Sequence, residues 1–212
     1  MKLTNKHFII IGLLASIVVG IGEYLLHFSP TGPRGEIEML LDIPLEKASI
    51  GHFFVVLGAP LYFAGYYGIK RIFSTTSTLL SNLIFIAGVL SFSIGGVWVS
   101  SRYFAAVVLQ KSIGTEDYAY YLSIYEDHYQ ILVWLLRIFI GSISLLYVLL
   151  ILKNSIGYPK WLAVFNPLIL LLLVFSTLFW FKPLGIHIAP IAMNVVHFIF
   201  FAIILKFTLK KN

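Results

Sequence analysis

The sequence predicts an all-α fold, a polytopic membrane helix bundle with six transmembrane helices and both termini in the cytoplasm. Of the 212 residues, 59% are hydrophobic and 11% are charged, whereas an ordinary soluble domain has about 25% charged residues. Apolar runs of about 20 residues, long enough to cross roughly 30 Å of hydrocarbon as a helix, recur along the chain. Basic residues are unequally distributed among the connections between these runs. A lipid bilayer is therefore the expected solvent.

Six apolar runs give the expected spans, and each must be helical because lipid offers no partner for unpaired backbone groups. They cover residues 7–28, 50–70, 79–101, 128–152, 161–181 and 188–207. The first run resembles a secretion signal because Lys2 and Lys6 precede it. No small-x-small cleavage site follows, so we expect the run to remain as a helix. Without internal repeats or linkers, residues 1–212 are expected to form a single transmembrane domain.

The cations give the orientation, because alternate connections of a six-span protein lie on opposite sides of the membrane. One side has nine cations: Lys2, Lys6, Lys70, Arg71, Lys153, Lys160, Lys206, Lys210 and Lys211. The other side has five: Arg34, Lys47, Arg102, Lys111 and Lys182. The positive-inside rule places the richer side, with both termini, in the cytoplasm. All acidic residues except Glu23, which is buried in the first span, then lie on the outer side.

Two connections on the expected outer side are long, and long loops often carry function. After the turn SPTGPRG, apolar residues at helical spacing up to Pro44 predict a short amphipathic helix on the outer surface. In the second connection, Thr115 is expected to cap a helix that continues into the fourth span. Tyrosines in this helix are typical of an aromatic belt at the lipid headgroups.

Polar side chains recur in the outer halves of the spans, and an ionisable residue inside a span indicates a functional site. Glu23 and His27 are four residues apart and share a helix face. The candidate ligand-binding residues are Glu23, His27, His52, Arg102, Arg137, Asn194 and His197. We expect them to line an outward-opening polar cavity in which Glu23 is the counter-ion of Arg137. Structural ion pairs, interfacial histidines and interhelical hydrogen bonds are the alternative interpretation of the same residues.

Three functions fit these residues. The first is binding of a small polar or anionic ligand or a lipid headgroup, with Arg102 and Arg137 as anion partners because guanidinium groups suit carboxylate and phosphate oxygens. The second is small-molecule transport, which usually requires inverted repeats and broken helices that are not evident here. The third is a metal-dependent lipid hydrolase whose Glu23 activates water and whose Zn²⁺ is held by His27, His52 and one of His128, His187 or His197.

The composition limits the metal ligands and the partners that can be expected. There is no cysteine, so only histidines and carboxylates remain as strong metal ligands. Under the hydrolase hypothesis, the chain would be superficially similar to ceramidase-like and adiponectin-receptor-like membrane proteins. Their paired HxxxH histidines and their seven spans are missing from this sequence. Because both features are missing, we do not favour a bound metal. The net charge of +6 comes from singly scattered residues, so we expect membrane lipids and no nucleic acid as partners.

Four segments together carry a family resemblance: GEYLLHFSPTGPRGE, IPLEKASIGHFFVVLGAPLYFAGYYGIKR, YPKWLAVFNP and APIAMNVVHFIFFAI. In this order they resemble a family of bacterial six-span integral membrane proteins known only as a domain of unknown function. The resemblance covers nearly the whole chain and implies a single multi-pass domain in a bacterial inner membrane. It implies no catalytic residues, cofactor or substrate.

The orientation can be tested with reporter fusions. We expect reporters at residues 71–78, at residues 153–160 and at both termini to be cytoplasmic, because short basic connections determine orientation. Protease protection and alkaline phosphatase activity in whole cells measure this. A C-terminal reporter that is accessible from outside would contradict the assignment of the cavity to the outer leaflet.

Overall fold

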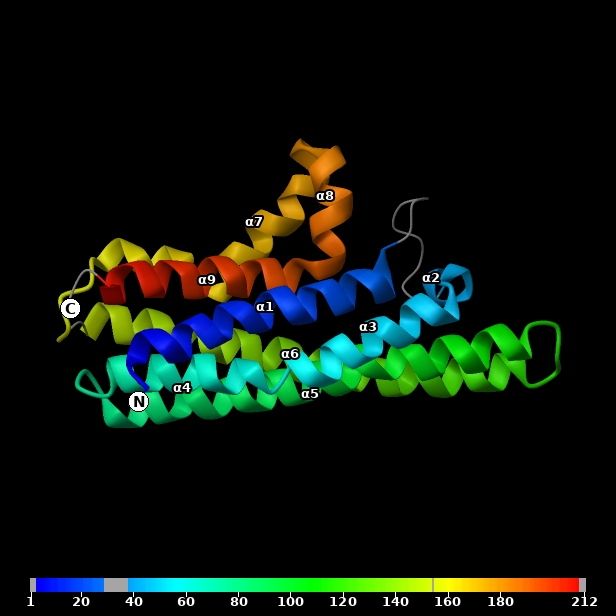
Figure 1. The fold of residues 1–212 in the computed structure, drawn as a ribbon, viewed down its shortest axis with the longest axis horizontal. Coiled ribbons are helices and arrows are strands. Elements are labelled where there is room, and N and C mark those ends of the chain that lie inside the picture. The colour runs from blue at the N-terminus through cyan, green and yellow to red at the C-terminus, as the bar shows by residue number, and fades with distance from the viewer. Residues whose placement is uncertain (1–2, 29–37, 154, 210–212) are drawn as a thin grey trace.

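The computed structural model describes residues 3–28, 38–153 and 155–209, which form helices and no strand (Figure 1). The all-α prediction is therefore confirmed for these residues. The expected turn SPTGPRG and residues Lys2, Arg34, Glu36, Lys210 and Lys211 lie outside the described part. The elements are α1 (Asn5–His27), α2 (Glu38–Asp42), α3 (Leu45–Gly58), α4 (Leu61–Phe73), α5 (Thr78–Ser112), α6 (Tyr118–Lys153), the 3₁₀ helix η1 (Lys160–Phe165), α7 (Pro167–Trp180), α8 (Lys182–Ile188), the 3₁₀ helix η2 (Ala189–Ile191) and α9 (Ala192–Leu209).

Five segments of the described chain are long and apolar enough to cross a membrane. They are Asn5–His27, Leu45–Phe73, Thr78–Ser112, Tyr118–Lys153 and Lys182–Leu209. The remaining apolar helix, Pro167–Trp180, has 14 residues, which give a length of roughly 21 Å, less than the hydrocarbon thickness. The number of six spans therefore stays a prediction.

Proline positions explain why three of the expected spans are interrupted. The second span divides at Pro60, between α3 and α4. The expectation of a continuous helix over residues 161–181 is wrong, because η1 occupies the beginning and Asn166 then caps α7 at Pro167. The region before α9 also breaks at η2, which contains Pro190. Broken helices, which the sequence did not reveal, are thus present.

The described parts of the two long connections contain more helix than loop. The short helix expected before Pro44 is confirmed as α2, and the helix expected after Thr115 does continue as α6 through the fourth apolar run. Thr115 is not its cap, because α6 begins at Tyr118 and the Thr115 hydroxyl donates to the Ser112 carbonyl at 2.8 Å. The α5–α6 turn lies at the end of the bundle opposite the start of α1 and the end of α9 (Figure 1).

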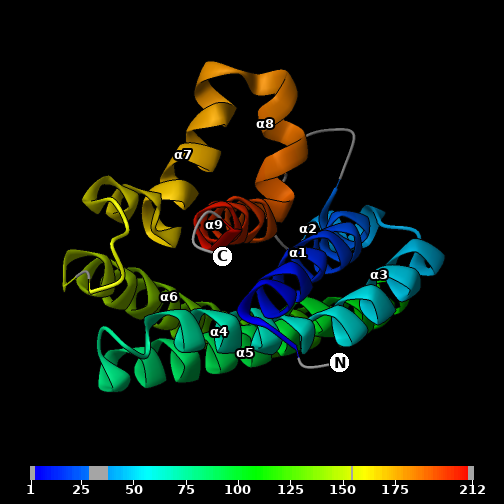
Figure 2. The same cartoon turned by 60° about the vertical axis from the view of Figure 1, so that its left-hand side comes forward.

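Helix α1 lies in the middle of the bundle, against α3, α4 and α9 (Figures 1 and 2). Glycines permit this close approach. A Cβ added to Gly65 would lie 2.8 Å from the Cα of Gly12 and 2.7 Å from the Phe201 ring. A Cβ added to Gly22 would lie 2.7 Å from the Gly51 carbonyl oxygen. Helices α7 and α8 form a hairpin that projects away from the rest of the bundle (Figures 1 and 2).

The glycine contact gives a testable prediction. Gly65→Ala should lower the melting temperature in detergent, because overpacking typically costs about 1–3 kcal/mol, more than the roughly 1 kcal/mol that alanine gains in a helix. Gly141→Ala in α6 is the matched control, since an added Cβ there meets nothing within 4 Å. The control should melt at the same or a higher temperature. Equal effects of the two substitutions would show that the α1–α4 contact does not require glycine.

Candidate functional site

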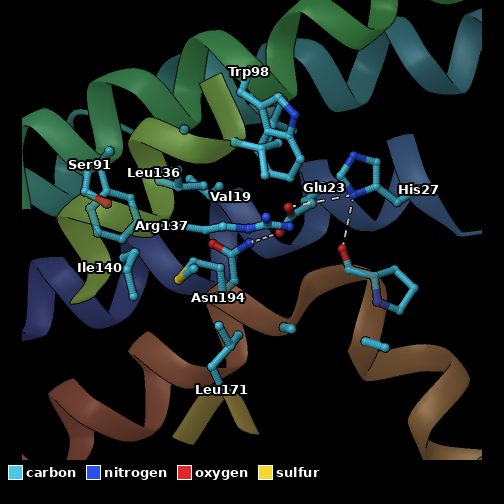
Figure 3. A pocket seen from close by; sticks show the side chains of 18 of the residues that line it. Val19, Glu23, His27, Ser91, Trp98, Leu136, Arg137, Ile140, Leu171 and Asn194 are labelled. Atoms are coloured by element: carbon cyan, nitrogen blue, oxygen red, sulfur yellow. Dashed lines mark hydrogen bonds and ion pairs between the residues drawn. The ribbon is translucent and has the colours of Figure 1, made fainter. Parts of the chain in front are cut away.

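A pocket of about 450 Å³ lies between the helices, and its lining is mostly apolar. Five of the seven candidate residues line it: Glu23, His27, Arg102, Arg137 and Asn194. Figure 3 labels four of them, Glu23, His27, Arg137 and Asn194. Helix α1 contributes Glu23 and His27, α5 contributes Arg102, α6 contributes Arg137 and α9 contributes Asn194. Tertiary packing thus brings together polar groups from four separate helices.

Glu23 is held from two sides. It is 5% exposed, and the amide nitrogen of Asn194 donates a hydrogen bond to its carboxylate (Figure 3). The amide oxygen of Asn194 in turn accepts a hydrogen bond of 2.7 Å from the Tyr62 hydroxyl. On the other side, Nδ1 of His27 lies 3.7 Å from the Glu23 carboxylate. A buried acid therefore has partners on its own helix and on α9, as burial requires.

His27 connects this cluster to the broken helix. Its Nδ1 lies 3.1 Å from the carbonyl oxygen of Pro190 in η2. Because a carbonyl only accepts hydrogen bonds, Nδ1 carries the proton in this contact. Nε2 of His27 is buried and has no hydrogen-bond partner in the described structure. The ring therefore presents a free polar atom within the pocket lining.

The predicted ion pair between Glu23 and Arg137 is wrong. The side chain of Arg137 extends from α6 into the pocket (Figure 3), but no ion pair joins it to Glu23 or to any other acid of the described chain. Its guanidinium lies 5.1 Å from the centre of the Trp134 ring. The side chain from another helix that contacts the Glu23 carboxylate is the neutral Asn194, which donates a hydrogen bond to it.

Arg102 is held among aromatic rings of α5 and α6. It is 3% exposed, and its guanidinium lies 4.7 Å from the centre of the Trp98 ring and 5.4 Å from that of Tyr129. Nη2 also donates to the Tyr129 hydroxyl at 3.4 Å. These contacts stabilise a buried guanidinium through cation–π attraction and fix its position in the wall. Its charge also interacts electrostatically with Glu23.

His52 and His197, the other two candidate residues, do not line the pocket. Nδ1 of His52 bonds the Ser100 carbonyl at 2.9 Å. His197 is fully buried, with Nε2 at 2.8 Å from the Tyr66 hydroxyl and Nδ1 at 2.8 Å from the Met193 carbonyl. The His52 ring thus bonds α5, and the His197 ring bonds α4 and its own helix, α9.

The histidines do not assemble the set expected for zinc. His27, His52 and His197 have separate surroundings, as their hydrogen-bond partners on different segments show. No group of three histidines or carboxylates that could hold a metal occurs among the described residues. A tetrahedral site with bonds of about 2 Å would require them to converge.

Two further pocket residues carry unpartnered polar atoms. Ser91 is fully buried, and neither its Oγ nor the Nε1 of Trp98 has a hydrogen-bond partner in the described structure. Both line the pocket with Arg102 from the same face of α5, since they lie at helical spacing. Helical periodicity in the sequence already predicts that Ser91 and Trp98 share the face of Arg102, although the two were not among the candidate ligand-binding residues. No sequence signal distinguished Tyr62, which resembles the other aromatic residues of its span.

The apolar part of the lining was also not anticipated. Helix α7 contributes Leu168, Leu171, Phe175 and Leu178. These residues look like any lipid-facing residue in the sequence, so the expected polar cavity is a mostly apolar pocket with polar groups on some of its walls.

Comparison with protein families gives one match. A model of a family of unknown function, DUF6796, matches residues 1–212. The chain belongs to this family. The expected membership of a family of unknown function is thus confirmed over the full length, and it assigns no residue a role. No curated protein and no solved structure matches the chain.

The hydrogen bond between Glu23 and Asn194 can be tested by exchanging its partners. Asn194→Asp places two carboxylates together and should destabilise the protein by about 3–5 kcal/mol, the scale of an uncompensated buried charge. Adding Glu23→Gln should recover part of this loss, because the glutamine can donate to the new aspartate. Thermal unfolding in detergent measures both. Additive losses in this double-mutant cycle would separate the two residues.

Proposed function

We propose that the chain is a multi-pass integral protein of the cell membrane that binds a small polar or anionic ligand, or a lipid headgroup, in this pocket. The observation that carries the proposal is the Arg137 guanidinium, which reaches into the pocket without an ion pair among the described residues (Figure 3). A charged group within an apolar segment is costly unless it faces a partner or a cavity. A bound anion would supply the partner.

The charge balance of the pocket supports an anion over a cation. Glu23 is the acid in the lining, and Asn194 already donates to it. Arg137 also lines the pocket, and no ion pair joins it to an acid of the described chain. Guanidinium groups bind carboxylate and phosphate oxygens through paired hydrogen bonds. Under the proposed orientation, the pocket opens toward the outer leaflet, since Glu23 and His27 lie near the outer end of α1.

Transport is the second candidate, and the break at η2 favours it. Discontinuous helices near a binding site are common in transporters, and the Pro190 carbonyl within this break contacts His27. A transporter also requires a polar route to the other side. Beyond the pocket, the buried polar groups Tyr62, Tyr66 and His197 are packed among aromatic rings. Ligand binding without transport therefore requires fewer rearrangements.

The hydrolase alternative would require His27, His52 and His197 to leave their present hydrogen bonds and converge. Each of these bonds would be lost, and each is a buried or partly buried contact. Elemental analysis provides a direct check. Stoichiometric zinc in the purified protein that is released by His52→Ala would favour the hydrolase hypothesis over anion binding.

Co-purification tests the binding proposal. Native mass spectrometry of gently purified protein should show an anionic molecule. Arg137→Gln should weaken its affinity about tenfold or more, as loss of a charge-assisted hydrogen bond predicts, and so lower its occupancy. Arg71→Gln is the matched control, because Arg71 stacks on Phe8 and does not line the pocket. Equal occupancy in wild type and Arg137→Gln would contradict anion binding at this site.

A further inference from the structure

We propose that the ligand is an anionic amphiphile that enters the pocket sideways from the bilayer, between α6 and α7. Its carboxylate or phosphate would lie at Arg137 and Arg102, and its acyl chain would lie along the apolar wall of α7. This inference rests on the proposed function, because it specifies the ligand of the same pocket.

Exposure of the lining residues locates the mouth of the pocket. Three lining residues are exposed: Arg137 of α6, and Leu168 and Phe175 of α7. Leu168 is 47% exposed and Phe175 is 41% exposed, whereas Glu23, Ser91 and Asn194 are buried. The pocket therefore opens between α6 and α7, and its buried polar groups lie further inside.

The surface around this mouth is apolar. On α7, Leu172 is 64% exposed and Leu173 is 57% exposed; on α6, Trp134 is 60% exposed and Ile138 is 58% exposed. Both helices belong to strongly apolar segments of the chain. An apolar surface of this kind faces lipid in a membrane protein, so the mouth opens to acyl chains rather than to water.

The pocket lining has two chemically different parts. One part contains the two guanidinium groups and the unpartnered polar atoms Ser91 Oγ, His27 Nε2 and Trp98 Nε1. The other part is the α7–α8 wall, which contributes Leu171, Leu178 and Ile186. A small soluble anion would satisfy the polar part and leave the apolar wall without contact. An amphiphile would satisfy both parts at once.

The volume of the pocket and the position of Arg137 agree with an amphiphile whose anionic head lies at the arginines. A pocket of about 450 Å³ is within the range of roughly 300–1,000 Å³ that encloses one small ligand. Arg137 is at the mouth, where its guanidinium would meet the anionic head during entry. Fatty acids and phospholipid-derived amphiphiles such as lysophosphatidate share this chemistry, and the choice of headgroup separates the two sources.

Binding should be measured with delipidated protein in nanodiscs of a zwitterionic lipid. The probes are oleate, lysophosphatidate, acetate and inorganic phosphate. We expect oleate or lysophosphatidate to bind at least about tenfold more tightly than the small anion with the same head, because two or three buried methylene groups together give that factor. The tighter of the two amphiphiles identifies the headgroup class.

A pair of neighbouring substitutions tests the apolar wall. Leu171→Trp fills the space in the pocket and should weaken amphiphile binding about tenfold or more while leaving small-anion binding unchanged. Leu172→Trp is the matched control, because Leu172 faces outward and does not line the pocket. Equal weakening by both substitutions would overturn the placement of the chain along α7.

A photoreactive oleate with a diazirine in its chain provides a readout that does not depend on the variants. Cross-links should map to residues 168–178 and disappear with excess unlabelled oleate. Cross-links confined to other helices would overturn the inference. If acetate or phosphate binds in an Arg137-dependent manner and the amphiphiles bind no more tightly, the proposed function stands and this inference fails. If no anion binds, both fail.

Discussion

The close packing of α1 against α3 and α4 is the constraint on which the rest of the structure depends. Facing glycines at 12 and 65, and at 22 and 51, leave no room for a side chain between these helices. Dense contacts of this kind drive association in lipid, where the hydrophobic effect gives helices no preference for one another. They fix α1 in the bundle centre, and α1 carries Glu23 and His27. The polar cluster therefore lies between helices.

Once Glu23 is buried, its neighbours are limited by the cost of leaving a carboxylate without donors. Asn194 meets this requirement from α9, and Tyr62 orients the Asn194 amide by donating to its oxygen. This chain joins α1, α4 and α9 through a single acid. No ion pair joins Arg137 to Glu23 in the described structure, and the Arg137 side chain lines the pocket.

The α7–α8 hairpin and the break at η2 determine the shape of the pocket. Proline at 167 and at 190 prevents the last two apolar runs from forming two uninterrupted helices. The shorter helices diverge from the bundle, and α7 then forms an apolar wall beside the polar cluster (Figure 2). The Pro190 carbonyl in η2 also orients the His27 ring through a hydrogen bond. Interrupted helices thus provide both the space and part of the polar lining.

The sequence by itself determined the helical class, the apolar segments and the faces on which polar residues lie, because hydropathy and helical periodicity are local properties. On this basis it placed Glu23, His27, Arg102, Arg137 and Asn194 in one site, and these five do line one pocket. It included His52 and His197 on the same reasoning. Only the tertiary structure left these two outside the pocket lining, paired Glu23 with Asn194, and brought leucines of α7 into that lining. These contacts depend on how each helix is rotated about its axis and on how closely it approaches its neighbours. The periodicity of a single helix carries no information about either.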